Sequence, residues 1–213
     1  MNIKSAYNIW AEQYDTNENK TRDLEGIALR TVLSGKHFDN CLEIGCGTGK
    51  NTEWLTSRTN KMTAVDLSDN MLARAKAKIQ SDKVDFVQAD INNEWSFAYN
   101  RQFDLATFSL VLEHIENLDG IFEKLSKVVK PNGYVYIGEL HPFKQYAGSK
   151  ARFETESGLQ VVTCFNHHVS DFTGSAKKYG FDMEALNEFF DNDDRTGIPR
   201  ILTLLFKSKL TSI

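Results

Sequence analysis

Three glycines at alternate positions, Gly45, Gly47 and Gly49, follow the short apolar run 41–44. Glycine lets a chain turn sharply from a strand into a helix, and it lets a ligand approach the backbone without a Cβ in the way. A helix over about residues 49–58 directs its free N–H groups at whatever the loop holds. The segment therefore predicts a buried strand, a ligand-binding turn and a helix, which form the first unit of an α/β fold.

Strand-like and helix-like segments alternate through the rest of the chain, which is the pattern of a parallel sheet with helices on both faces. Ser68 can cap one intervening helix. Asn117 or Asp119 can open another, and Pro131 ends it. We predict strands at 41–44, 62–65, 84–89, 103–109, 134–139, 181–190 and 201–206. The last two are joined by too short a stretch for a helical crossover, so we expect them to pair antiparallel.

The predicted fold is α/β: a Rossmann-like, seven-stranded, mostly parallel sheet with helices on both faces and its last strand antiparallel. Because the chain has no internal repeat and no low-complexity linker, we expect a single domain over residues 1–213. Residues 1–35 are predicted to form an N-terminal helical cover, and residues 139–169 a small lid insertion after the fifth strand. Within the insertion, 153–156 and 159–165 flank Ser157 and Gly158 as a hairpin.

The composition limits the class of protein and its partners. A net charge of −4 argues against a nucleic-acid surface, which normally carries a basic excess. No apolar run approaches the roughly 20 residues of a membrane helix, and residues 1–7 lack the apolar stretch of a secretory signal. We therefore expect a cytoplasmic protein without a membrane partner. The three cysteines lack metal-ligand spacing, so we expect no metal. Whether the chain is a monomer or a homodimer stays open.

Two acids extend the prediction for the glycine loop. Asp66 lies at the end of the second predicted strand, 23 residues after Glu43, where a carboxylate can accept both hydroxyls of a ribose. Asp90 ends the third predicted strand and can accept from an adenine amino group. The carboxyl ends of parallel strands are where open α/β sheets bind ligands. Together the loop and the two acids predict a cleft for a nucleoside.

These segments resemble the class I S-adenosylmethionine-dependent methyltransferases, especially the small-molecule branch of the ubiquinone-biosynthesis and malonyl-carrier-protein enzymes. The resemblance rests on Glu43-x-Gly45-x-Gly47-x-Gly49, Val65-Asp66, Gln88-Ala89-Asp90 and Leu125-x-x-Val128-Val129-Lys130-Pro131-x-Gly133. It covers about residues 5–140 by motif. It implies S-adenosylmethionine as cofactor and S-adenosylhomocysteine as product.

The resemblance also implies roles for single residues. Gly45 and Gly47 line the methionine part of the cofactor, Asp66 holds the ribose, and Asp90 with Ile91 flanks the adenine. Ser109 lies near the sulfonium. The implied cofactor-binding set is completed by Glu43, Cys46, Leu67, Met71 and Tyr14. Tyr14 belongs to a predicted helix over the cofactor, Tyr7-x-x-Trp10-Ala11-x-x-Tyr14, whose aromatic residues could equally be core.

Two other functions compete with a methyltransferase. A nicotinamide-dependent oxidoreductase would use Asp66 on a dinucleotide ribose, but its GxGxxG fingerprint needs glycine where this chain has Lys50. A non-catalytic S-adenosylmethionine-binding protein would keep the same cleft. The favoured prediction is an enzyme that methylates oxygen or nitrogen of a small metabolite, either anionic or neutral.

Methyl transfer to a hydroxyl or an ammonium needs a proton acceptor, whereas transfer to a carboxylate does not. His141 follows the fifth predicted strand, and His168 ends the insertion, so both are candidate bases. His114 follows the fourth predicted strand and has either a role near the methionine end or a structural one. For the substrate, the candidates are Lys144, Tyr146 and Arg152, which could bind an anionic, partly apolar molecule or could be solvated lid residues.

Overall fold

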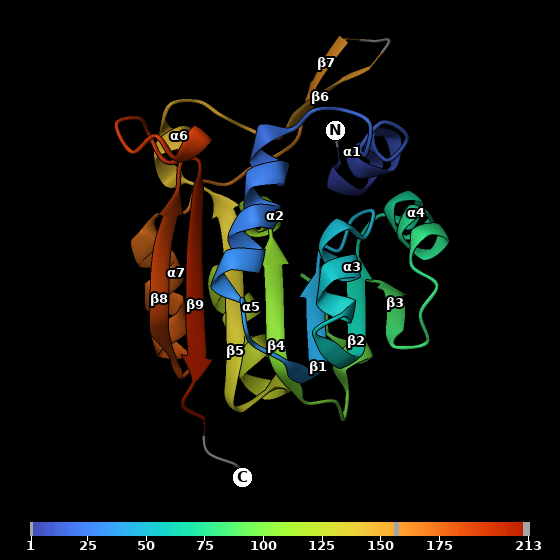
Figure 1. Cartoon of the computed structure of the whole chain (residues 1–213), viewed down its shortest axis with the longest axis vertical. Helices are drawn as coiled ribbons and strands as arrows, with labels where there is room; N and C mark the ends of the chain where they lie inside the picture. The colour runs from blue at the N-terminus through green and yellow to red at the C-terminus, as the bar shows by residue number, and fades with distance from the viewer. Residues whose placement is uncertain (1, 156–157, 211–213) are drawn as a thin grey trace.

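The computed structural model describes residues 2–155 and 158–210 of the chain, and its centre is one seven-stranded sheet (Figure 1). The strands follow the order β3-β2-β1-β4-β5-β9-β8. Their bounds are β1 (Phe38–Ile44), β2 (Thr59–Asp66), β3 (Val84–Gln88), β4 (Phe103–Ser109), β5 (Val129–Leu140), β8 (Phe181–Phe189) and β9 (Ile201–Ser208). Strands β1 to β5 pair in parallel, whereas β9 pairs antiparallel with both β5 and β8. The predicted fold class is confirmed.

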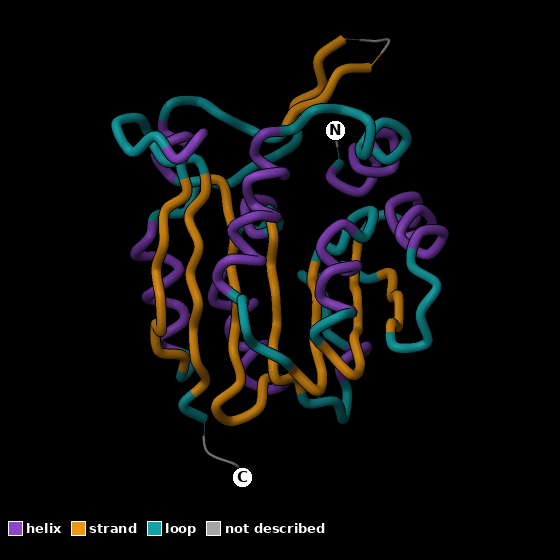
Figure 2. Tube along the Cα trace, in the orientation of Figure 1, coloured by secondary structure: helices purple, strands orange, loops and turns teal. Residues whose placement is uncertain are grey.

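Helices cover both faces of this sheet. On one face lie α2 (Lys20–Val32), α3 (Lys50–Thr56) and α4 (Asp69–Lys78); on the other lie α5 (Leu118–Val128) and α7 (Val169–Lys178). In Figure 2 the helices α2 and α3 stand in front of the strands, with α5 and α7 behind them. Leu29, Leu55 and Leu72 pack in the core of the first face, and Phe122 and Phe172 pack in that of the second.

Local sequence signals explain most of these boundaries. Ser68 accepts a hydrogen bond from the backbone N–H of Met71, and Asn117 accepts from that of Gly120, so both are N-caps. Helix α5 therefore begins after Asn117 and not after Asp119. Strand β5 starts at Val129, five residues before the prediction. The pairing of β4 with β5 shifts register there, and Asn132 adopts a φ of 61°, so the expected turn is a bulge inside the strand.

Two further segments lie over the carboxyl ends of the parallel strands. One contains α1 (Ile3–Trp10), and the other runs from α6 (Pro142–Tyr146) through β6 (Arg152–Thr155) and β7 (Gly158–Val161). Strands β6 and β7 pair antiparallel, as the predicted hairpin requires, with β6 starting one residue earlier than predicted and β7 ending four residues earlier. Ser157 of the predicted turn and residue 156 lie outside the described residues.

The two segments are joined by their own small hydrophobic cluster. Trp10 stacks on Phe153 with ring centroids 4.9 Å apart, and the Gln13 side chain donates to the carbonyl oxygen of Glu154 at 2.6 Å. We call the buried residues of this group the cover cluster: Ala6, Trp10, Ala11, Met71, Phe153 and Val162. It is separate from the two cores that flank the sheet, so α1 and the hairpin form one unit above the strand ends.

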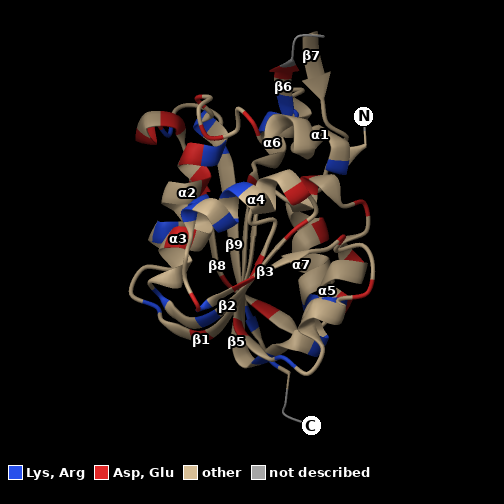
Figure 3. Cartoon of the chain, turned by 90° about the vertical axis from the view of Figure 1, so that its right-hand side faces the viewer, with Lys and Arg blue, Asp and Glu red and all other residues tan. Residues whose placement is uncertain are grey.

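The charged residues do not gather by sign on the side of the molecule shown in Figure 3, where Lys and Arg are intermixed with Asp and Glu. Among the described residues, no helix combines the length and the apolar character needed to cross a membrane.

Candidate functional site

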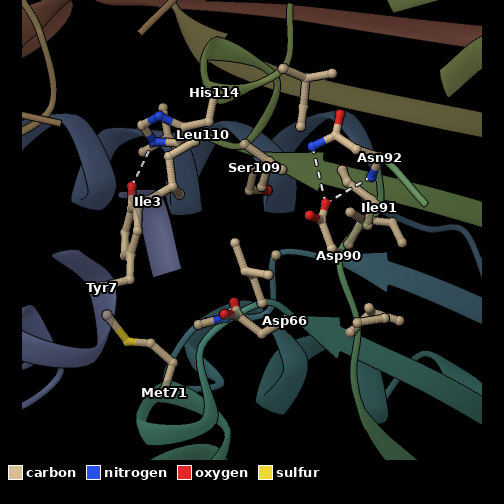
Figure 4. A pocket seen from close by; sticks show the side chains of 18 of the residues that line it. Ile3, Tyr7, Asp66, Met71, Asp90, Ile91, Asn92, Ser109, Leu110 and His114 are labelled. Atoms are coloured by element: carbon tan, nitrogen blue, oxygen red, sulfur yellow. Dashed lines mark hydrogen bonds between the residues drawn. The ribbon is translucent and has the colours of Figure 1, made fainter. Parts of the chain in front are cut away.

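A cleft lies at the carboxyl ends of β1, β2, β3 and β4, beneath α1, and holds about 720 Å³ of space including its mouth (Figure 4). Its walls come from segments far apart in the sequence: α1, the glycine loop, the end of β2, the residues after β3 and the residues after β4. The lining residues include Tyr7, Tyr14, Gly45, Gly47, Asp66, Leu67, Met71, Asp90, Ile91, Ser109, Leu110, Val111 and His114.

The glycine loop is held against the second strand. The backbone N–H groups of Gly45 and Cys46 donate to the carbonyl oxygen of Val65 at 2.7 and 3.0 Å. Gly45 has a φ of +73°, and a Cβ there would overlap the side chain of Val111. Only glycine fits this position, because both the backbone conformation and the neighbouring chain exclude a side chain.

Asp66 links the loop to the next helix. Its Oδ2 accepts from the backbone N–H of Gly47 at 2.8 Å, and its Oδ1 accepts from that of Ser68 at 2.8 Å. Burial raises the pKa of Asp66, and these backbone hydrogen bonds oppose the rise. Each carboxylate oxygen has a second lone pair, so a residue that lines the cleft in this way can still accept from two hydroxyls of a ligand.

Asp90 is oriented by the residue two positions later. Its Oδ1 accepts from the backbone N–H and from the side-chain Nδ2 of Asn92, at 2.9 and 3.0 Å, as Figure 4 shows. Ile91 is buried beside it. The acid and the apolar side chain can hold the polar edge and the face of a planar base.

Ser109 belongs to a buried polar network beneath the cleft. Its hydroxyl donates to Oε1 of Glu25 at 2.7 Å, and Tyr136 donates to the same oxygen at 3.1 Å. Asn51 donates to the other carboxylate oxygen at 2.9 Å. Burial raises the pKa of Glu25, while these hydrogen bonds lower it. The network fixes the end of β4 against α2 and α3.

A tyrosine and a histidine form a hydrogen-bonded pair at one wall of the cleft. The hydroxyl of Tyr7 lies 2.8 Å from Nε2 of His114, and Nδ1 of His114 lies 2.8 Å from the carbonyl oxygen of Thr163. A carbonyl can only accept, so Nδ1 carries the proton and Nε2 accepts from Tyr7. Figure 4 shows this pair at one wall, opposite Asp90. Sequence reasoning left His114 open and missed Tyr7, although Tyr7 starts the aromatic pattern from which Tyr14 was chosen.

Glu139 shapes the loop that carries His114. Its Oε1 accepts from the backbone N–H groups of Val111 and Leu112, at 2.9 and 2.7 Å. Burial raises the pKa of Glu139 to about 8, with the nearby carboxyl of Glu113 adding to the rise. The buried acid at the end of β5 therefore orders the chain after β4.

Nine of the eleven predicted cofactor residues line the cleft; Glu43 and Cys46 do not. Glu43 points beneath the loop, where it accepts from the hydroxyl of Thr52 at 2.5 Å, and burial raises its pKa to about 8. The side chain of Cys46 packs in the core under α3. Both residues support the loop rather than line the cleft.

The structure places the two candidate bases away from this cleft. His141 is 2% exposed; its Nδ1 accepts from the backbone of Phe143 at 3.2 Å and its Nε2 lies 3.0 Å from Glu188, so both ring nitrogens are occupied. Burial lowers the pKa of His141. His168 is exposed at the start of α7, with its Nδ1 2.6 Å from the hydroxyl of Tyr146. Neither position favours a role as base.

A second pocket, which holds about 1020 Å³ of space including its open mouth, lies beside the cleft and shares Tyr7, Tyr14 and Leu110 with it. Its other lining residues include Trp10, Lys20, Glu113, Lys150, Arg152 and Arg200. Of the three predicted substrate residues, Arg152 lines this pocket. Lys144 and Tyr146 lie outside it on α6, where Lys144 is 4.0 Å from Asp191.

One cluster has the side-chain types of a metal site. Ligand atoms of Glu113, His114 and Cys164 lie within 4.8 Å of one another. However, the two ring nitrogens of His114 are taken up by Tyr7 and by the carbonyl of Thr163. The imidazole therefore has no free lone pair for a metal ion in this arrangement.

Comparison with known proteins points to one kind of chemistry. A family profile described as a methyltransferase domain matches residues 42–137. An uncharacterized methyltransferase of Emericella nidulans is 27% identical over 220 residues, which cover 85% of this chain and 76% of the relative. The malonyl-(acyl-carrier protein) O-methyltransferase of Priestia megaterium is 33% identical over 136 residues, covering 62% of this chain and 48% of that enzyme. The chain thus spans about half the length of the latter relative.

Solved structures share the fold. The N-methyltransferase NodS from Bradyrhizobium japonicum, in complex with S-adenosylhomocysteine, matches with a TM-score of 0.70 at 17% identity, over 98% of this chain and 99% of that chain. The matched profile spans the glycine loop, both strand-end acids and most of β5.

Proposed function

Because this chain belongs to the class I S-adenosylmethionine-dependent methyltransferases, we propose that it transfers a methyl group from S-adenosylmethionine to oxygen or nitrogen of a small anionic molecule. The observation that carries the proposal is the pair of adjoining pockets. One has paired acids at strand ends behind a glycine loop, the other has a cationic rim, and Tyr7, Tyr14 and Leu110 line both.

The first pocket supports the cofactor assignment. In this proposal Asp66 holds the ribose hydroxyls, Asp90 and Ile91 the adenine, and the backbone of Gly45 and Gly47 the methionine part; that all five line the cleft supports these roles. Bound there, S-adenosylmethionine supplies the activated methyl group, and the protein supplies position and proton transfer.

The second pocket supports an anionic acceptor. Lys150 and Arg152 are exposed side chains of the insertion, and Lys20 begins α2. Arg200 is held in place by Asp191, with Nε–Oδ1 and Nη2–Oδ2 distances of 2.5 and 2.6 Å. Arginine and lysine at a pocket mouth favour a carboxylate or another anion.

Tyr7 and His114 are the proposed route for the proton. They lie where the two pockets meet, and the tautomer set by Thr163 leaves Nε2 as the acceptor. A proton taken by the Tyr7 oxygen can pass to His114 along the existing hydrogen bond. This assignment replaces His141 and His168, whose imidazoles lie outside both pockets.

The α1 segment and the β6–β7 hairpin are proposed to act as the lid. They contact each other through the cover cluster, and they contribute Tyr7 and Arg152 to the two pockets. Excluding water above the sulfonium would protect the methyl group and strengthen charge interactions within the site.

The proposal is tested by calorimetry followed by turnover. S-adenosylhomocysteine should bind, whereas NADH should not. Methylation is then measured over a panel of carboxylic acids, phenols and amines; binding without any turnover would favour the non-catalytic alternative. Arg152→Ala should raise KM for the acceptor about tenfold or more without changing that for the cofactor, as expected for one charged contact. Lys144→Ala, which removes a cation outside the pocket, is the matched control.

A further inference from the structure

Glu113 is a buried acid whose position in the second pocket calls for a ligand. It lies in the short helix η2 (Leu112–His114) and is 6% exposed, yet it lines the pocket. Its Oε2 is buried and has no hydrogen-bond partner among the described residues. A buried carboxylate oxygen without a donor is costly, so such a group normally finds a partner when its site is filled.

No protein cation is bonded to Glu113 in the part of the chain that is described. The nearest positive candidate is His114, whose Nε2 lies 3.9 Å from Oε1 of Glu113 but accepts from Tyr7 instead. Burial raises the pKa of Glu113, and both His114 and a hydrogen bond with the uncharged thiol of Cys164 oppose the rise. The aromatic rings of Tyr7, Trp10 and Tyr14 line the same pocket and can stabilise a cation through their faces.

The opposite charge lies at the mouth of the pocket. Lys150 and Arg152 are exposed on the hairpin segment, whereas Glu113 is buried at its inner end, beside the residues shared with the cofactor cleft. The pocket thus has an acidic, aromatic inner end and a predominantly basic rim, where the exposed side chains of Lys20, Lys150 and Arg152 outnumber that of Glu18. A molecule that complements both ends is positive near the cofactor and negative near solvent.

Building on the proposed function, we infer that the methyl acceptor is the nitrogen of an amine carried by a small carboxylate, held with its nitrogen at Glu113 and its carboxylate at Lys150 and Arg152. A hydroxyl would also donate to Glu113, but it would leave the acidic end without a countercharge. An ammonium supplies both the donor and the charge.

The transfer step balances with the residues present. The bound ammonium loses one proton to the Tyr7 oxygen while Tyr7 passes its own to Nε2 of His114, which becomes an imidazolium near Glu113. The nitrogen lone pair then forms the N–CH₃ bond, and the S–CH₃ bond breaks with its electron pair returning to sulfur. The product is the N-methylated ammonium and S-adenosylhomocysteine.

The test compares three matched probes on protein saturated with S-adenosylhomocysteine. A straight-chain ω-amino acid series that includes γ-aminobutyrate supplies both charges; γ-hydroxybutyrate lacks the amine, and butylamine lacks the carboxylate. In calorimetry, at least one amino acid of the series should bind about tenfold or more tighter than its hydroxyl and decarboxylated analogues, the effect of one charge-assisted contact. With S-adenosylmethionine, the same compound should be N-methylated.

Variants of Glu113 assign this preference to one residue. Glu113→Gln should weaken binding of the amino acid about 10- to 100-fold and leave the hydroxy acid unaffected, because only the charged contact is lost. Glu116→Gln, a change of an exposed acid that lines neither pocket, should leave the binding of both compounds unchanged. Thermal unfolding checks that each variant folds. Glu113→Asp keeps the charge with a shorter reach and should show an intermediate loss.

The outcomes separate this inference from the proposed function. Three results would overturn the amine assignment and leave the cofactor assignment standing. The first is that the hydroxy acid binds and is methylated to the same extent as the amino acid, and the second is that Glu113→Gln changes nothing. The third is that no compound of the series binds to protein that does bind S-adenosylhomocysteine. If S-adenosylhomocysteine itself fails to bind, the proposed function falls first.

Discussion

Replacing Asp66 by Asn is the most direct test of the cofactor cleft. In the structure each carboxylate oxygen already accepts one backbone N–H, from Gly47 and from Ser68, both at 2.8 Å. An amide keeps one acceptor oxygen and puts an NH₂ group where the other stood. The variant therefore loses a loop contact and also the means to accept both hydroxyls of a ribose.

The expected loss follows from the number of hydrogen bonds. A hydrogen bond to a charged group contributes about 1.5–3 kcal/mol, and the variant loses one such bond to the ligand, since the loop contact is present with and without ligand. At about 1.4 kcal/mol for each factor of ten, the Kd for S-adenosylhomocysteine should rise about 10- to 100-fold. Isothermal titration calorimetry measures this, and circular dichroism checks that the variant keeps its fold.

Asp69→Asn is the matched control. Asp69 lies three residues further along, in the first turn of α4, and forms an exposed ion pair with Lys4 at 2.7 Å. Its substitution removes the same charge outside the cleft and should cost at most about 1 kcal/mol of stability. If Asp66→Asn binds S-adenosylhomocysteine within about threefold of the unchanged protein, our reading of the strand-end acid is refuted.

Three further changes test other parts of the structure. Gly45→Ala should abolish cofactor binding and lower stability by more than the 1–2 kcal/mol or so of a left-handed conformation, because its Cβ also meets Val111; a folded variant that binds normally would contradict this. His141→Ala should destabilise the protein by about 1–3 kcal/mol, since it loses its bonds to Glu188 and to α6, while the Kd for S-adenosylhomocysteine stays the same; urea unfolding and calorimetry would separate the two effects. Burial raises the pKa of Glu139 from 4.5 to about 8, so its contribution to stability is full below about pH 4.5 and is lost as the pH rises toward 8. In a plot of the free energy of unfolding against pH, Glu139→Gln should therefore flatten the slope between these two values. An unchanged slope would show that the pKa of Glu139 is not raised.

The sequence alone predicts features that depend on neighbouring residues in the chain. Strand β1, its glycine loop and the acids at the ends of β2 and β3 are set by short-range patterns, and parallel strands bring their ends together regardless of other detail. For the same reason the antiparallel pair β8–β9 follows from the short connection between its strands.

Features that depend on tertiary packing could not be predicted in this way. Which tyrosine of the α1 region reaches His114 depends on the rotation of the helix, which the stacking of Trp10 on Phe153 sets across more than 140 residues. His141 follows a strand end as Asp66 does, yet α6 begins at once and turns its ring toward β8. The hydrogen bond between Glu25 and Ser109 joins α2 to β4. The two residues are far apart in the sequence, so no local pattern predicts their contact.

The cover cluster has a consequence for turnover. Met71 of α4, which lines the cofactor cleft, packs in that cluster with Trp10 of α1 and Phe153 of the hairpin. We therefore expect a displacement of the hairpin to move α1 as well, so that the two pockets open together. Departure of a methylated product would then expose the spent nucleoside to exchange, and renewal of the methyl donor would be tied kinetically to product release.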